Sequence, residues 1–193
     1  MLQSEGIYRC DFERSNFTDW REQYDWLARE MKSRIGNPSK GVYYPVWAWY
    51  MKEGRRKKPD FRRERWENGW KGERFVCMEV DIPDSKVLLS DFDDWSMILL
   101  NGLISDSEEE DGRMEKECES LPSWERQAYR HKNWERAFSI SPLDNDWVHR
   151  GDTIQATFWE LRKECIRKAW FFTAARKSLN QYESPSRNNL CSD

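Results

Sequence analysis

One segment carries most of the folding information in the sequence: Tyr43-Tyr44-Pro45-Val46-Trp47-Ala48-Trp49-Tyr50. It gathers large aromatic side chains in a chain of 193 residues that is 35% charged. The chain also contains 12 tryptophans. Because each buried aromatic side chain removes about 150–250 Å² from water, we expect a core built from a few large rings.

The alternation within this segment predicts a β-strand over residues 42–51. Val46, Ala48 and Tyr50 would share one face of the strand, and Trp47 and Trp49 the other. Since both faces are apolar, we expect a central strand that is covered on both sides.

Periodicity elsewhere predicts a mixture of helices and strands. One face of a helix is predicted from Phe17, Trp20, Tyr24, Leu27 and Met31, with Ser15 or Asn16 as its cap and Gly36-Asn37-Pro38 as its end. A later helix would bury Trp124, Ala128, His131, Trp134 and Phe138, and another would follow Asp91–Asp94. Strands are predicted over residues 75–82, 87–89, 154–159 and 169–173, the first with Val76, Met78, Val80 and Ile82 on its apolar face. The expected fold class is α+β, a small mixed or antiparallel sheet with flanking helices.

Length and composition predict one folded domain. Mean hydropathy is −1.01, but aromatic residues make up 15% of the chain, whereas disordered chains are poor in them. We expect a single globular domain over residues 1–177 and a flexible tail over residues 178–193, where Ser, Asn and Arg dominate.

The sequence offers no sign of a membrane span, a leader or a metal centre. No apolar run approaches the roughly 18 residues that a membrane helix needs, and no basic-then-apolar signal region follows Met1. The five cysteines never form a Cys-x-x-Cys pair, which favours reduced thiols and a cytoplasmic protein. With two histidines, His131 and His149, a site of several imidazoles is excluded.

Two features permit a chemical or a structural interpretation. The acids Asp91, Asp93 and Asp94 can bind a divalent cation or simply cap a helix, and the second interpretation is favoured. Similarly, His131 is interpreted as a partly buried core residue with a polar tip rather than as a catalytic base.

Charge is segregated along the chain. Residues 52–74 hold ten Lys or Arg against five Asp or Glu, a balance of +5, and residues 105–119 have a balance of −6. Both segments can be solvated loops. Alternatively, the first forms a basic groove for a phosphate-bearing ligand such as a dinucleotide or nucleic acid.

Four segments together resemble a bacterial domain-of-unknown-function family, number 3841. They are residues 43–50, 58–62, 87–95 and 154–161, and the resemblance extends in the same order from about Gly6 to Phe172. Members of that family begin with a strand similar to Trp-Thr-Ile-Gln, which this sequence does not contain. The resemblance implies a bacterial or phage protein and little about activity.

A more distant resemblance involves Gln155-Ala156-Thr157-Phe158-Trp159 and Ala169-Trp170-Phe171-Phe172. This layout is similar to the closing strand pair of ADP-ribosyltransferase-like folds, in which a Gln-Ala-Glu segment supplies the catalytic glutamate. Thr157 stands where that glutamate is expected. The resemblance implies NAD as cofactor, with Gln155 and Glu160 as the candidate catalytic residues.

Two functional hypotheses follow. In the first, the chain binds NAD or another nucleotide: Trp47, Trp49 or Tyr50 stacks on a ring, and Arg55, Arg56, Lys57 and Lys58 contact phosphates. In the second, the chain is a non-catalytic module whose basic segment binds nucleic acid or an acidic protein surface.

Overall fold

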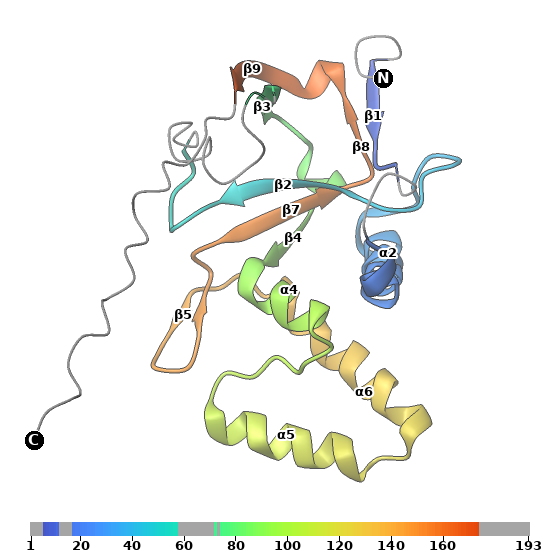
Figure 1. Cartoon of the computed structure of the whole chain (residues 1–193), viewed down its shortest axis with the longest axis vertical. Coiled ribbons are helices and arrows are strands. Elements are labelled where there is room, and N and C mark those ends of the chain that lie inside the picture. The colour runs from blue at the N-terminus through green and yellow to red at the C-terminus, as the bar shows by residue number, and fades with distance from the viewer. Residues whose placement is uncertain (1–5, 12–16, 58–71, 73, 174–193) are drawn as a thin grey trace, which may run out of the picture. The chain divides into compact units, whose positions relative to one another are not determined.

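The computed structural model describes residues 6–11, 17–57, 72 and 74–173. It divides into two compact units, Met1–Lys57 with Val80–Arg167, and Lys58–Glu79 with Lys168–Asp193. Helices and strands are mixed along the chain, which confirms the α+β class (Figure 1). The expected single domain over residues 1–177 stays a prediction, and its boundary lies outside the described residues.

The first unit contains all the described α-helices. They are α2 Arg21–Ile35, α4 Phe92–Leu99, α5 Glu108–Ser120 and α6 Ser123–Trp134. The strands are β1 Ile7–Arg9, β2 Val46–Met51, β4 Leu88–Asp91, β5 Leu143–Asp144, β6 His149–Arg150, β7 Ile154–Phe158 and β8 Glu160–Arg162. Short 3-10 turns are η2 Phe17–Trp20, η3 Asp84–Lys86, η4 Glu135–Phe138 and η5 Lys163–Cys165.

The main sheet has the strand order β2-β7-β4, and both ladders are antiparallel (Figure 1). β7 is therefore the central strand, and its residues Ile154, Ala156 and Phe158 are buried. The prediction that residues 42–51 form a central, covered strand is wrong, because β2 has β7 as its one partner among the described strands. The face that carries both tryptophans is covered only in part: Trp47 faces the core, whereas Trp49, two residues later, is 50% exposed.

Aromatic rings from helices α2, α4 and α6 pack with Trp47 of β2 to form the core on this sheet. The ring of Tyr24 from α2 lies 5.5 Å from that of Trp95 in α4, and Trp47 lies 5.0 Å from Trp95 (centroid distances). The ring of Trp26, also in α2, packs edge-on against that of Trp134 in α6, with the centroids 5.4 Å apart. Large rings are thus a main part of the described core, as expected, but aliphatic side chains such as Leu27, Met31 and Ile98 share it with them.

Helix α2 follows its predicted period except at its beginning. Tyr24, Leu27 and Met31 are buried as expected, and the helix ends at Gly36, whose φ of 87° is easily adopted by glycine. Trp20 is 39% exposed, because it precedes the first full helical turn, so its predicted place in the core is wrong. The proposed caps, Ser15 and Asn16, lie outside the described residues.

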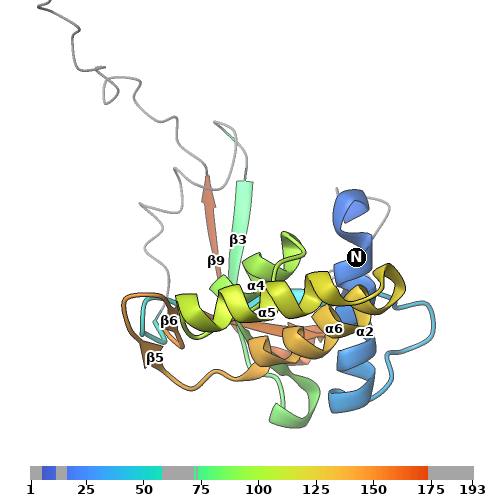
Figure 2. The same ribbon diagram turned by 90° about the horizontal axis from the view of Figure 1, so that it is seen from below.

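Most of the acidic segment over residues 105–119 forms helix α5 and is not a solvated loop. Ser107 accepts a hydrogen bond from the backbone N–H of Glu110, and the Glu110 carboxylate accepts one from the N–H of Asp106, which together begin α5. Met114 and Cys118 pack with Leu103 and Tyr129, so α5 and α6 form a hairpin (Figure 2).

The predicted buried face of α6 is correct only in its second half. Trp134 is buried, and the half-buried His131 lies 5.0 Å from its ring, consistent with the interpretation of His131 as a core residue. Trp124 is 78% exposed and Ala128 is exposed. Both predictions are wrong, because these two residues of the first half of α6 lie outside the core.

The described part of the second unit consists of most of β3 Arg74–Val80 paired with β9 Ile166–Thr173. Val80 and the first two residues of β9 belong to the first unit. Phe75 stacks on Phe172 at 5.6 Å. The predicted strands are confirmed, although Val76 is 44% exposed instead of buried.

Two further findings concern the whole described chain. No helix within it is long and apolar enough to cross a bilayer. Cys10, Cys77, Cys118 and Cys165 are thiols, as expected, and Cys191 lies outside the described residues.

Replacing Leu27 by Ala tests the packing of α2. Leu27 is 1% exposed, so the cavity should lower the free energy of unfolding by about 2–5 kcal/mol. Trp20→Ala is the matched control, because it removes a larger side chain from a more exposed position and should cost much less. Urea unfolding measures both. A larger loss for Trp20→Ala than for Leu27→Ala would contradict the packing described.

Candidate functional site

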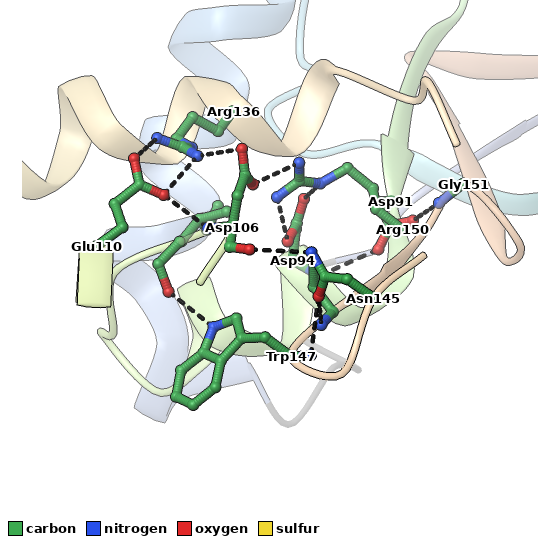
Figure 3. Close-up of polar contacts among 12 residues, drawn as sticks. Asp91, Asp94, Asp106, Glu110, Arg136, Asn145, Trp147, Arg150 and Gly151 are labelled. Atoms are coloured by element: carbon green, nitrogen blue, oxygen red, sulfur yellow. Dashed lines mark hydrogen bonds and ion pairs between the residues drawn. The ribbon is translucent and has the colours of Figure 1, made fainter. Parts of the chain in front are cut away.

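A cluster of ion pairs joins the β5–β6 hairpin to α4, α5 and η4 (Figure 3). Arg150 Nε donates to Asp94 Oδ2 at 2.7 Å, and its Nη1 donates to Asp106 Oδ1 at 2.8 Å. The side chains of Arg150 and Asp94 are each 6% exposed. Arg136 continues the chain of charges, with contacts of 2.8 Å to Asp106 and 3.0 Å to Glu110.

Asp91 fixes the start of α4 within this cluster. Its Oδ1 accepts hydrogen bonds from the backbone N–H groups of Asp93 and Asp94, and its Oδ2 accepts one from Gly151 N at 2.8 Å. Gly151 has a φ of 92°, and a Cβ there would lie 2.8 Å from the Pro142 Cα, so only glycine fits. This confirms the capping interpretation for Asp91, whereas Asp94 is buried in the ion pair with Arg150. No cluster of metal ligands occurs among the described residues.

The electrostatics of the cluster are those of a structural element. Burial raises the pKa of the Asp94 carboxyl, against the opposing effect of its hydrogen bonds with Arg150. The backbone N–H of Asp106, followed by the Arg136 guanidinium, lowers the pKa of Glu110 despite partial burial. Since these acids are paired with guanidinium groups, the cluster holds the hairpin against α4 and α5.

Glu160 and Gln155 lie in different sheets. Glu160 begins β8, where it is the register partner of Arg9, and its carboxylate accepts hydrogen bonds from Arg9 at 3.2 Å and from Arg162. Burial would raise the pKa of Glu160, but the hydrogen bonds from Arg162 and Arg9 outweigh it and lower the pKa. This geometry makes Glu160 the link between β1 and β8, and its catalytic role stays a prediction.

Thr157 cannot replace the missing glutamate. The residue is 1% exposed, and its hydroxyl donates to the carbonyl oxygen of Leu88 at 3.1 Å. Gln155, two residues earlier on β7, is the register partner of both Trp49 and Ser90. Gln155 therefore lies beside the exposed aromatic residue of β2 and not beside Glu160.

An aromatic and basic surface forms around the edge strand β2. Trp49 is half-exposed, and its ring lies 5.4 Å from that of Phe92, the first residue of α4. The Lys52 ammonium lies 5.8 Å from the centroid of the Trp49 ring. A cation at this distance from a ring face is attracted by the ring quadrupole.

The chain then turns tightly and presents further basic residues. The backbone N–H groups of Lys52 and Arg55 donate to each other's carbonyl oxygens at 3.1 Å, with Gly54 at a φ of 66°. The Arg56 guanidinium lies 3.8 Å from the centroid of the Tyr50 ring. Arg55, Arg56 and Lys57 are exposed, whereas Lys58 lies outside the described residues.

We call Trp49, Tyr50, Lys52, Arg55, Arg56, Lys57 and Phe92 the β2 surface. Of the predicted binding residues, it includes Trp49, Tyr50 and the described basic ones. Trp47 is not part of it, because its ring packs against Tyr24 and Trp95. The role of Phe92 was missed, although its position directly after the cap Asp91 is the signal that could have placed it on the helix surface.

The paired acids of α5 predict an acid-sensitive fold. Because the folded pKa of Glu110 is lowered, the carboxylate stabilises the fold above its ordinary pKa, and this contribution is lost as the pH falls through the lowered value. Glu110→Gln should cost about 1–3 kcal/mol at neutral pH and flatten the stability curve between about pH 5 and pH 3.

Urea unfolding across this pH range measures the effect, with the exposed neighbour Glu109→Gln as control. Equal steepness for wild type and Glu110→Gln would show that the pairing of Glu110 does not contribute to acid sensitivity.

Comparison with known proteins gives one match. The model of a family described as a domain of unknown function (DUF3841) matches residues 2–167. Neither the curated proteins nor the solved structures gave a match. The match covers the sheet, α2 to α6 and the whole β2 surface, and the chain belongs to the DUF3841 family.

Proposed function

We propose that the chain is a binding module that holds single-stranded nucleic acid on the β2 surface. The observation that carries this proposal is the half-exposed ring of Trp49, with Lys52 over it and a turn of exposed basic residues directly after it. Bases stack on such rings, and cations beside the rings contact the phosphates.

The edge position of β2 supports stacking. Trp49 keeps half of its surface in water because β2 has a neighbour on one side only among the described strands. Phe92 braces the ring at 5.4 Å, so little side-chain freedom remains to be lost when a base stacks. Each stacked base is worth about 1–3 kcal/mol in proteins of this kind.

The charge distribution supports a local, salt-sensitive contact. The whole chain has a net charge of −3, and the acids of α5 contribute strongly to it. A nucleic acid would therefore be attracted by the cluster of Lys52, Arg55, Arg56 and Lys57 and not by the protein as a whole. Such binding weakens steeply as salt rises.

The residues do not fit the transferase chemistry that the distant resemblance implies. Thr157 is buried and bonded to the backbone, and the carboxylate of Glu160 is paired with two guanidinium groups. NAD binding stays a prediction. Free NAD can be tested as a competitor, and nicotinamide release as the sign of turnover; we expect no release.

Fluorescence anisotropy with a labelled 12-nucleotide oligo-dT tests the stacking contact. Trp49→Ala should weaken binding about 5- to 150-fold, which corresponds to 1–3 kcal/mol. Trp124→Ala is the matched control, because that indole is 78% exposed on α6, away from the β2 surface. Equal losses in the two variants, or no binding at low salt, would contradict the proposal.

The salt dependence tests the phosphate contacts separately. The triple change of Arg55, Arg56 and Lys57 to Gln should reduce the slope of log K against log salt by about 2, since each single-stranded phosphate contact contributes about 0.7. The control changes the exposed Lys32, Lys116 and Lys132 to Gln, which alters net charge equally. If the control reduces the slope as much, the attraction is not local to the β2 surface.

A further inference from the structure

We infer that the core face of the main sheet encloses one ordered water molecule, held by Ser90, Gln155 and Trp47. Each of these side chains has a buried polar atom without a hydrogen-bond partner among the described residues: Ser90 Oγ, Gln155 Oε1 and Trp47 Nε1. Buried polar groups are nearly always paired, with protein or with ordered water. The inference is independent of the proposed function.

The register of the sheet brings the three side chains to one face. Ser90 and Gln155 are direct partners across the β4–β7 ladder, and Trp47 is the partner of Thr157, two residues beyond Gln155 on β7. Direct partners, and residues two apart along a strand, share a face. Cβ atoms of direct partners lie about 4.5–5.5 Å apart, and diagonal neighbours are within reach of long side chains.

The core helices cover this face around Trp47, whereas Trp49, the direct partner of Gln155 on the same face, is half-exposed. The Trp47 ring lies 6.2 Å from Tyr24 of α2 and 5.0 Å from Trp95 of α4, measured between centroids. Ser90 is 2% exposed. The three polar atoms are themselves buried, so their partner must be inside the protein.

A single water molecule matches the hydrogen-bonding capacity of the three atoms. The Trp47 indole N–H can only donate, the Gln155 Oε1 can only accept, and the Ser90 hydroxyl can do either. Water accepts from the indole, donates to the amide oxygen, and makes its third bond with the hydroxyl. Buried waters in proteins typically make about three such bonds.

A double-mutant cycle tests the shared partner. Ser90→Ala and Gln155→Met each remove one hydrogen bond of the water molecule, so each should lower the urea midpoint. The midpoint of the double variant should fall by less than the sum of the two single effects. The control cycle pairs Gln155→Met with Thr157→Val, because the Thr157 hydroxyl lies on the same face and has its own acceptor, the Leu88 carbonyl. This cycle should be additive.

Two outcomes of these cycles would contradict the inferred water. If no water is present, Ser90→Ala removes an unsatisfied group, so the midpoint should stay unchanged or rise, and the two changes should add. Equal coupling in both cycles would indicate packing rather than a shared water.

A measurement on the unaltered protein avoids any dependence on how the variants fold. NMR cross-relaxation between water and the Trp47 indole proton should give a signal with the sign of a long-lived bound water. Absence of that signal on an assigned, sharp indole resonance would overturn the inference.

Discussion

Strand β7 is the constraint on which the rest of the structure depends. Its five residues form ladders with β2 on one side and β4 on the other, and four of them are buried. A strand that must pair on both edges while covered on both faces has little freedom in register. Among the described strands, its position leaves β2 at an edge of the sheet, where Trp49 is half-exposed while Trp47, two residues earlier, remains in the core.

The polar cluster fixes the segment that leads into β7. Asp91 ends β4, caps α4 and accepts from Gly151, three residues before Ile154. Arg150 joins the same hairpin to Asp94 and Asp106. Because a buried ion pair resists the removal of either partner, this arrangement holds α4 and its first residue, Phe92, where Phe92 can brace Trp49.

Hydrophobic periodicity predicts those helices and strands in which the buried residues recur at regular spacing. The spacing of Tyr24, Leu27 and Met31 predicted α2, and alternation predicted β7, because burial in the structure follows the same period. Helix α5 was missed because acids dominate its sequence, although Ser107 and Glu110 form the Ser-x-x-Glu signal of a helix start.

The candidate site was predictable only in part. Trp49 and the basic residues after it are close in sequence and were identified together. The contact of Trp49 with Phe92, and that of Glu160 with Arg9, 151 residues away, depend on strand pairing that no local pattern encodes. Apolar residues on both faces of β2 predict burial on both sides, whereas the ring of Trp49 is half-exposed.

Mapping of amide and indole NMR shifts during titration with oligo-dT tests the central claim most directly. The account predicts saturable shifts of the Trp49 indole and of the backbone amides of residues 52–57, with no change at the Trp124 indole. Shifts centred on α5 and α6, or no shifts at low salt, would contradict it.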